Sequence, residues 1–272
     1  GHRQHGGHKV IRRTESTLAL QPAGPGGLRR GEMGVGAGIV LDSDPHEEFA
    51  ECQLKARFLT GLSNDFELFE TLHASRAGGC RQQERHLARL AASSAYFGFH
   101  WDAEAARAVL LAACAARPDD APFRLRLALR QDGRFTVQSG ALSALPETVN
   151  VMLAPDATTA DDLFLRHKSS VRARYDAAWR AAEAQGGFDM LFFNERGELT
   201  EGGRSNVFVR LDGRWHTPPL SCGLLPGVQR ATMLADPAWD AQETIITRPM
   251  LARAEAIVVC NALRGALTAA LI

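Results

Sequence analysis

The chain has 272 residues, of which 45% are hydrophobic, and its 31 lysines and arginines balance its 31 aspartates and glutamates. This length and apolar content allow one large domain or two modest ones, while the zero net charge gives no indication of a nucleic-acid or membrane-surface partner. No apolar run approaches the ~20 residues that span a membrane. The five cysteines are scattered without a CxxC pair, which predicts a reduced, cytoplasmic protein.

Residues 1–30 have a composition unlike that of the remaining chain. They include His2, His5 and His8 and the run GPGG at 24–27, and they offer little apolar surface to bury. We therefore expect a tail with little fixed structure here, solvated rather than metal-binding.

Residues 31–62 begin with the glycine-rich run GVGAG at 34–38, followed by the apolar residues IVL and the turn DSDP at 42–45. A helix from about 46 to 62 would place Glu48, Glu51 and Lys55 along one face. By spacing alone this is a solvated helix face. The glycines are a poor dinucleotide-binding fingerprint, because a strand and a turn follow them where a helix should begin.

The pattern from residue 66 onward is that of a compact enzyme. In the stretch 63–157 the sequence predicts a strand at 66–72, helices at 82–97 and 103–116, and a hairpin of strands 123–129 and 135–139 around Asp132-Gly133. A linker near 154–162 separates this lobe from a second lobe at 158–272. There we expect a helix from Lys168 to about 184, strands at 189–194, 199–209, 214–217 and 256–260, and a helix at 228–234.

Lys168 is one of three lysines in the chain, with Lys9 and Lys55, and it stands in the run RHKSS at 166–170. A lysine amine bonds covalently to an aldehyde only when it is neutral part of the time, which requires a desolvated site or a neighbouring cation. Arg172, four residues on, is such a cation. Taken alone, Lys168 also fits a surface lysine.

Four further motifs accompany this lysine. Glu201 lies in TEGGRSNVF at 200–208, and TPPLSCGLLPG at 217–227 forms a turn into a helix whose first amides favour an anion. Arg89 lies in RHLARL at 85–90, and Asn261 lies in VVCNAL at 258–263. On local sequence alone, Glu201 is a loop carboxylate, Arg89 is an exposed helix arginine and Asn261 is a cap at a strand end.

In this order and spacing the motifs resemble the class IV pyridoxal-phosphate enzymes and, within them, the aminodeoxychorismate lyases, over roughly residues 66–272. The resemblance implies an α+β fold of type IV, like D-amino-acid aminotransferase. A small α/β lobe at 63–157 and a larger lobe at 158–272 with a barrel-like sheet would enclose the cofactor, in a homodimer.

The resemblance also implies roles for single residues. Lys168 would bond to pyridoxal 5'-phosphate and then act as a general base, and Glu201 would keep the pyridine nitrogen protonated. The phosphate would lie against Arg89, Gly227, Val228, Gln229 and Asn261. Arg172 and Arg204 are candidates for binding substrate carboxylates, and we assign no metal site.

A second resemblance concerns residues 34–56, which look like the carboxy-terminal end of the chorismate-binding domain of aminodeoxychorismate synthase component I. There, acidic residues matching Glu48 and Glu51 serve a magnesium ion, and a lysine matching Lys55 lies nearby. Nearly all of that domain is missing here. We expect this piece to be a remnant that is catalytically inactive by itself.

The expected activity is a folate-pathway lyase that converts 4-amino-4-deoxychorismate to 4-aminobenzoate and pyruvate. One alternative is a branched-chain or D-amino-acid aminotransferase of the same fold, which needs a 2-oxo acid as acceptor. Another is a non-catalytic fragment of a synthase–lyase fusion.

Overall fold

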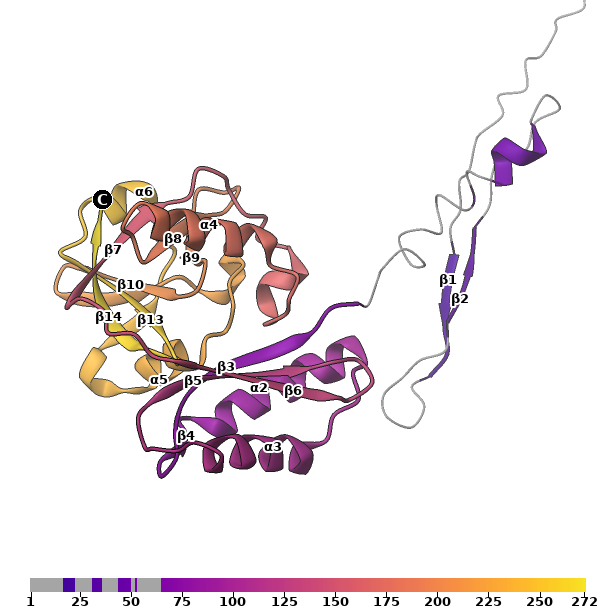
Figure 1. Ribbon diagram of the computed structural model, residues 1–272. Helices are drawn as coiled ribbons and strands as arrows, with labels where there is room; N and C mark the ends of the chain where they lie inside the picture. Colours follow the sequence, from indigo (N-terminus) through magenta and orange to yellow (C-terminus); the bar gives the residue numbers. More distant parts are fainter. Residues whose placement is uncertain (1–16, 23–30, 36–43, 50–51, 53–64) are drawn as a thin grey trace, which may run out of the picture. The chain divides into compact units, whose positions relative to one another are not determined.

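The computed structural model describes residues 17–22, 31–35, 44–49, 52 and 65–272 (Figure 1). The chain divides into two compact units, Gly1–Asp65 and Phe66–Ile272. In the first unit, strand β1 (Thr17–Leu20) pairs antiparallel with β2 (Gly31–Gly34). The expectation of little structure over residues 1–30 therefore fails for β1, because alternating Thr, Leu, Ala and Leu suit a strand once a partner strand is available.

A short helix in the first unit begins where the sequence predicts a helix start. Residues 45–49 are helical, and the Asp44 carboxylate accepts a hydrogen bond from the His46 amide at 2.7 Å, as a helix N-cap does. Glu48 lies on this helix, whereas Glu51 and Lys55 lie outside the described residues.

The small lobe of the second unit is a four-stranded antiparallel sheet in the order β4-β3-β5-β6. Its elements are β3 (Leu68–Ser75), β4 (Gly79–Cys80), α2 (Gln83–Phe97), α3 (Ala103–Ala115), β5 (Phe123–Leu129) and β6 (Phe135–Ala141). Helices α2 and α3 lie against one face of the sheet (Figure 1). Because side chains alternate along a strand, Leu68 and Leu72 pack into that core, while Phe69 and Thr71 face the other way.

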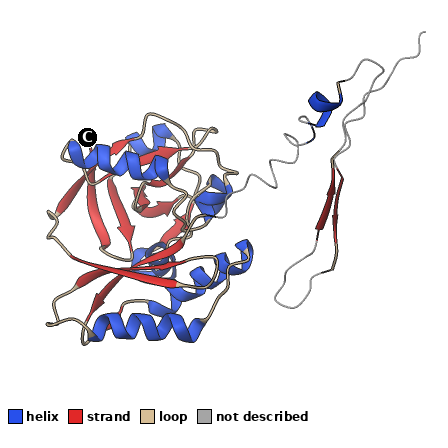
Figure 2. Cartoon of the chain, turned by 45° about the vertical axis from the view of Figure 1, so that its right-hand side comes forward, coloured by secondary structure: helices blue, strands red, loops and turns tan. Residues whose placement is uncertain are grey.

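The large lobe is built on an eight-stranded sheet in the order β12-β11-β10-β13-β14-β7-β8-β9, which curls into a half-barrel (Figure 2). Its strands are β7 (Thr148–Leu153), β8 (Asp189–Phe193), β9 (Leu199–Gly202), β10 (Asn206–Leu211), β11 (Arg214–Thr217), β12 (Ala241–Glu243), β13 (Ala256–Asn261) and β14 (Gly265–Leu271). Helix α4 (Ala173–Ala184) packs on β8 and α5 (Val228–Ala235) on β13, with α6 at Arg248–Ala252. Short 3-10 helices occupy Leu163–Arg166, Leu220–Cys222 and Pro237–Trp239.

This architecture confirms the predicted fold, an α+β protein with a small lobe and a larger lobe that has a barrel-like sheet. Strands β7, β12 and β14 and helix α6 have no counterpart in the sequence prediction, since short or alanine-rich segments carry little periodicity. The strand predicted over 199–209 is two strands, β9 and β10, separated by a bend at 203–205. The helix predicted to follow Lys168 begins at Ala173.

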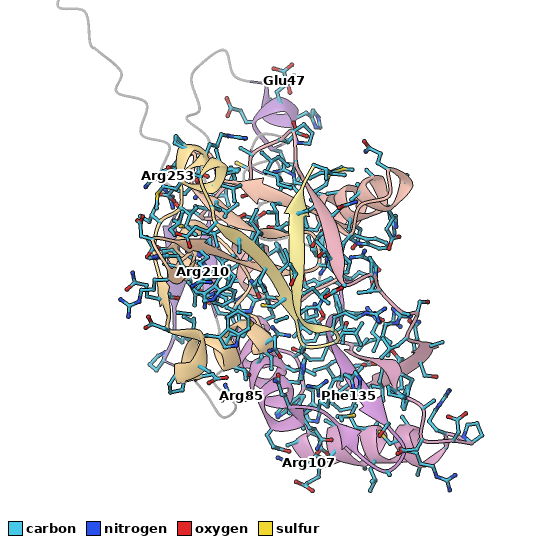
Figure 3. The ribbon with its side chains drawn as sticks, turned by 90° about the vertical axis from the view of Figure 1, so that its left-hand side faces the viewer. Glu47, Arg85, Arg107, Phe135, Arg210 and Arg253 are labelled. Carbon is cyan, nitrogen blue, oxygen red and sulfur yellow. The ribbon has the colours of Figure 1, made fainter. Side chains whose placement is uncertain are left out.

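Charged side chains such as Arg107, Arg210 and Arg253 lie at the periphery of the second unit (Figure 3). Arg107 pairs with Glu84 at 2.8 Å, and solvent screening makes such an exposed pair a minor contributor to stability. Across the described residues, no helix combines the length and the apolar character needed to cross a membrane.

Candidate active site

A cavity of about 480 Å³ lies within the second unit, between β3 and β5 of the small lobe and the turns of the large lobe. The structure brings every site residue predicted from the sequence to its wall. They are Arg89, Lys168, Arg172, Glu201, Arg204, Gly227, Val228, Gln229 and Asn261.

Lys168 is fixed by backbone pairing with the small lobe. Its carbonyl oxygen accepts a hydrogen bond from the Phe69 amide at 2.9 Å, and the Ser170 amide donates to the Glu67 carbonyl at 2.8 Å. The Lys168 Nζ atom then lies 4.8 Å from the centre of the Phe69 ring. The backbone is therefore anchored at Lys168 itself and two residues beyond it, and the Lys168 side chain lines the cavity.

Burial of the amine and the nearby guanidinium groups of Arg172 and Arg89 lower the pKa of Lys168 to about 7. Burial disfavours the ammonium ion, and the two cations disfavour it further. Near neutral pH a large fraction of the side chain is therefore the neutral amine that the predicted chemistry requires.

Glu201 is the penultimate residue of strand β9 and is 6% exposed. Its carboxylate accepts hydrogen bonds from the Leu225 amide and from Asn206 Nδ2, both at 3.1 Å. Burial raises the pKa of Glu201 to about 8, although the Leu225 hydrogen bond and Arg172 act in the opposite direction. A buried carboxylate of this kind favours a cation placed against it.

Tyr175 of α4 is a cavity residue that the sequence did not single out. It is 7% exposed, and its hydroxyl lies beside the Glu201 carboxylate without forming a hydrogen bond of good geometry to any described residue. Burial and the neighbouring charge of Glu201 raise the pKa of Tyr175, so the hydroxyl stays protonated. A buried hydroxyl without a partner is a site at which a ligand can supply one.

A buried carboxylate shapes the turn that follows Glu201. Asp189 is fully buried and accepts hydrogen bonds from Ser205 Oγ at 2.6 Å and from the Arg204 amide at 3.0 Å. A Cβ atom on Gly202 would lie 2.3 Å from Asp189 Oδ2, so a side chain cannot be accommodated there. The glycines of TEGGRSNVF thus allow close approach to Asp189, which holds the bend between β9 and β10.

The predicted phosphate site lies where α5 begins. Gly227 is the residue before the first turn, and a Cβ atom there would lie 1.8 Å from Asn206 Oδ1. Gln229 accepts a hydrogen bond from Gln82 Nε2 at 3.2 Å, which joins this helix to the small lobe. The amides of the first turn and the helix dipole together favour an anion.

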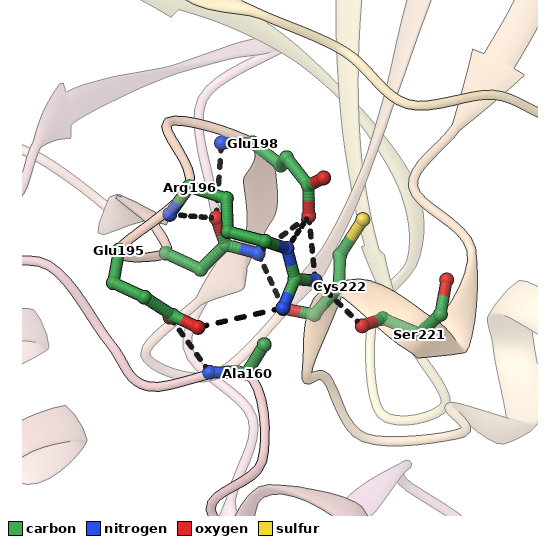
Figure 4. A network of polar contacts seen from close by, with 7 residues as sticks. Ala160, Glu195, Arg196, Glu198, Ser221 and Cys222 are labelled. Carbon is green, nitrogen blue, oxygen red and sulfur yellow. Dashed lines mark hydrogen bonds and ion pairs between the residues drawn. The ribbon is translucent and has the colours of Figure 1, made fainter.

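A polar network holds the segment that leads to Gly227 (Figure 4). Arg196 donates to Glu198 Oε2 at 2.7 Å and to the Ser221 carbonyl at 2.9 Å, while Asn194 donates to the Cys222 carbonyl at 3.0 Å. The hydrogen bonds from Arg196 and Asn194 outweigh partial burial and lower the pKa of Glu198 to about 2. The β8–β9 turn thereby fixes the loop ahead of α5.

Asn261 and Arg204 line the cavity, but the Asn261 amide and both Nη atoms of Arg204 are hydrogen-bonded to the protein, whereas Arg204 Nε is buried without a hydrogen-bond partner among the described residues. Asn261 Nδ2 donates to the Arg204 carbonyl at 3.1 Å, and its Oδ1 accepts from the Arg264 amide at 2.8 Å. The Arg204 guanidinium donates to Glu183 at 2.8 Å and to the Phe188 carbonyl, and it packs over the Phe188 ring. Asn261 therefore caps the end of strand β13, as its local sequence indicated. The two hydrogen bonds of Arg204 hold neighbouring segments of the protein together.

Arg172 lies close enough to Lys168 for its charge to lower the pKa of that amine. Its Nε atom donates to Asp176 at 2.9 Å and its Nη2 atom to the Gly203 carbonyl. The guanidinium lies 5.8 Å from the centre of the Phe69 ring, the same ring that Lys168 contacts. It remains our candidate for a substrate carboxylate.

Two arginines on β5 also line the cavity, although the sequence analysis did not identify them. Arg124 and Arg126 alternate with leucines in FRLRLAL. In the β3–β5 ladder they lie opposite His73 and Thr71, and both arginines face the cavity side of the small sheet. That alternation was the signal available in the sequence. The cationic residues of the cavity wall are Arg89, Arg124, Arg126, Lys168, Arg172, Arg180 and Arg204, against the carboxylates Asp176 and Glu201. This excess favours a ligand with several anionic groups.

The raised pKa of Glu201 has a consequence for stability that can be measured without ligand. The folded protein holds a proton on Glu201 up to about pH 8, whereas a free glutamate releases it near its ordinary value of 4.5. The contribution of this pKa shift to the free energy of unfolding is therefore fully present below pH 4.5 and is lost as the pH rises through about 8. The lowered pKa of Lys168 has the opposite effect on stability, because the folded protein is stabilised as the pH rises from about 7 to 10.5.

We expect Glu201→Gln to remove the loss between pH 4.5 and 8, because the amide does not ionise. In urea unfolding of the cofactor-free proteins, the variant should gain stability relative to wild type from pH 5 to pH 8. The exposed Glu147→Gln substitution is the matched control and should leave the difference between the two pH values unchanged. An equal pH dependence in wild type and Glu201→Gln would contradict the prediction.

Comparison with known proteins agrees with the motif assignments. The family described as amino-transferase class IV matches residues 67–272, and the family described as chorismate binding enzyme matches residues 24–61. Both resemblances inferred from the sequence are thereby confirmed.

Some of the similar proteins are named as lyases and others as aminotransferases. A Schizosaccharomyces pombe protein, provisionally named an aminodeoxychorismate lyase, is 28% identical over 185 residues, covering 66% of this chain and 79% of the relative. The structure of 4-amino-4-deoxychorismate lyase from Pseudomonas aeruginosa has a TM-score of 0.66 at 25% identity, covering 75% of this chain and 82% of that one. A structure from Mesorhizobium loti, provisionally named an amino-acid aminotransferase, has a TM-score of 0.70 at 36% identity, covering 76% and 100%.

Proposed function

Because the chain belongs to the class IV aminotransferase family, whose enzymes depend on pyridoxal phosphate, we propose that it is a lyase that converts 4-amino-4-deoxychorismate to 4-aminobenzoate and pyruvate. The observation that carries this proposal is the cationic wall of the cavity. The substrate has two carboxylates and the cofactor has a phosphate, so three anionic groups must be bound together. A branched-chain amino acid presents a single carboxylate.

The residues of the cavity fit the cofactor. Lys168 supplies an amine that is neutral part of the time, and Glu201 supplies a buried carboxylate for the ring nitrogen. Tyr175 has a buried hydroxyl without a partner, and Arg89 lies beside the start of α5, where a phosphate is favoured. When bound, pyridoxal phosphate supplies an aldehyde that reacts with amines and a ring that accepts electrons.

Lys168 then has a second task as the general base. Its amine takes the proton from the substrate ring carbon that carries the amino group, for which a pKa near neutrality is well suited. The bond from the neighbouring ring carbon to the enolpyruvyl oxygen breaks, enolpyruvate leaves and becomes pyruvate, and the ring becomes aromatic. Aromatisation makes the elimination strongly downhill, so the protein has mainly to bind and orient.

Cations on two sides of the cavity are placed to orient the substrate. Arg172 lies beside Lys168, and Arg124 and Arg126 lie on the opposing small-lobe sheet. We assign them to the two substrate carboxylates, since guanidinium groups bind carboxylates bidentately. Arg172 and Arg204 each donate two hydrogen bonds to the protein, but Arg172 is the one whose charge acts on Lys168, which makes Arg204 the weaker of the two candidates named from the sequence.

An aminotransferase is the second candidate, favoured by the 36% identity to the Mesorhizobium loti protein. It would use the same residues for the cofactor but would need a 2-oxo acid to complete its cycle. The two reactions differ in whether an amino acceptor is required.

The deciding experiment supplies the purified, cofactor-loaded protein with 4-amino-4-deoxychorismate and no 2-oxo acid. The lyase releases pyruvate and 4-aminobenzoate in equal amounts, measured by coupling to lactate dehydrogenase and by fluorescence. Absence of pyruvate, together with amino transfer from leucine or D-alanine to 2-oxoglutarate, would assign the aminotransferase instead. Absence of both reactions would favour the non-catalytic fragment.

For residues 31–62, which the chorismate-binding family match at 24–61 largely covers, we retain the proposal of an inactive remnant. Chorismate, ammonia and magnesium should yield no aminodeoxychorismate, and measurable turnover would overturn this. A cytoplasmic homodimer likewise remains our prediction, to be tested by fractionation and by sedimentation of the purified protein.

A further inference from the structure

Three polar side chains of the small lobe form a buried cluster beside the cavity. Glu70 on β3 is 1% exposed, and its Oε2 atom lies 2.6 Å from His86 Nδ1. Arg89, one helical turn after His86 on α2, donates from Nε to Glu70 Oε1 at 2.9 Å and from Nη2 to Oε2 at 2.6 Å. A buried carboxylate thus engages the side of the guanidinium bidentately.

The electrostatics of the cluster keep Glu70 ionised. Burial alone would raise the pKa of Glu70, but Arg89 and the His86 hydrogen bond outweigh it and hold the pKa at about 2. The ion pair therefore persists across the physiological pH range. The sequence does not predict this ion pair. Glu70 lies on the same face of β3 as the core residues Leu68 and Leu72, where the pattern predicts an apolar side chain.

The contacts leave Arg89 in one orientation. A guanidinium has five N–H donors; here the Nε donor and one donor on Nη2 go to Glu70, and one donor on Nη1 goes to the Pro226 carbonyl at 3.0 Å. Two donors, one on each Nη atom, are left over. Because Pro226 directly precedes Gly227 and α5, the same guanidinium also joins the small lobe to the predicted phosphate site.

We propose that Glu70 is a positioning residue that fixes Arg89 for the phosphate of the cofactor. The inference rests on the cofactor placement given above but not on the choice between lyase and aminotransferase. Two effects of Glu70 oppose each other here. Its negative charge weakens the attraction of Arg89 for a phosphate. Its two hydrogen bonds order the long Arg89 side chain before the phosphate binds, so less conformational entropy is lost on binding.

The test compares pyridoxal phosphate with pyridoxal, which lacks the phosphate, in cofactor-free protein. Dissociation constants are measured by absorbance for wild type, Glu70→Gln and Glu70→Asp. Both variants should bind pyridoxal phosphate on the order of 10- to 100-fold more weakly, by analogy with the loss of the residue that orients a metal ligand. Binding of pyridoxal should change by less than about 2-fold, since the substitutions leave the Lys168 and Glu201 side chains in place and the charge of Glu70 is a minor influence on the pKa of Lys168.

The matched control is Glu84→Gln, which removes a carboxylate paired with Arg107 on the exposed side of α2. It should leave both dissociation constants unchanged. Tighter or unaltered binding of pyridoxal phosphate by Glu70→Gln would overturn the proposal, because charge would then outweigh position. Wild-type affinity in Glu70→Asp, or an equal loss for pyridoxal, would overturn it as well.

A measurement on the wild-type protein covers the case in which the variants do not fold. The Nε proton of Arg89, observed by nitrogen-15 NMR without cofactor, should exchange slowly with water because Glu70 holds it. Rapid exchange would show that Arg89 is not ordered in advance and would sink the proposal. Failure of the proposed enzymatic activity alone leaves all these binding results unaffected.

Discussion

Replacement of Lys168 by alanine is expected to abolish the covalent link to pyridoxal phosphate and to lower turnover at least about 10³-fold. The other lysines, Lys9 and Lys55, lie outside the family match at 67–272. The cavity wall offers arginines instead, whose guanidinium groups stay protonated and cannot replace a neutral amine. The loss should therefore be close to complete.

The measurement joins spectroscopy to peptide mapping. Wild-type protein loaded with cofactor should show visible absorbance, and borohydride followed by proteolysis should place the label on the peptide that contains Lys168. The alanine variant should show neither. A label on Lys9 or Lys55, or visible absorbance retained in the variant, would contradict the assignment.

Chemical rescue separates loss of the base from loss of the fold. Small primary amines added to Lys168→Ala should restore part of the turnover in proportion to their concentration, since the cavity remains intact. The backbone contacts of this segment use the Lys168 carbonyl and the Ser170 amide, which the substitution leaves in place. A variant that melts like wild type but is not rescued would argue against the role as base.

The contiguous motifs of this chain are what made its site predictable. RHKSS, TEGGRSNVF and LLPG each place a candidate site residue beside the turn residues that position it, and residues of all three motifs line one cavity. Amphipathic helices and the hairpin are equally local, so α2, α3 and β5 follow the predicted ranges closely.

Contacts between distant segments were beyond the reach of local pattern. Asp189 meets Ser205 only because β8 and β9 pair, and Glu70 meets Arg89 only because α2 packs on β3. Each is an acidic residue in an apolar strand, which periodicity reads as an anomaly without naming its partner. The commitment of the Arg204 guanidinium to Glu183 likewise depends on how α4 lies against β8.

Replacement of Glu201 by glutamine should separate holding the cofactor from using it. The amide matches the carboxylate in shape, and its single carbonyl oxygen can keep the hydrogen bond from the Leu225 amide, whereas its NH2 group cannot accept from Asn206 Nδ2. Loss of one hydrogen bond costs roughly 1 kcal/mol, so cofactor binding should change only a few-fold. It carries no charge to favour a proton on the pyridine nitrogen. Turnover should therefore fall on the order of 10²- to 10³-fold, the scale seen when one preorganised electrostatic contact is removed.

The distribution of this loss between kcat and KM tests the assignment. Because Glu201 faces the cofactor rather than the substrate carboxylates in our placement, kcat should fall while KM stays within about 2-fold. The exposed Glu147→Gln variant should match wild type in both constants. Since Glu201 is buried and Asp176 is already paired with Arg172, neither water nor the other wall carboxylate can restore the missing charge. A Glu201→Gln enzyme that keeps more than half of its turnover would place the electron-accepting ring elsewhere in the cavity.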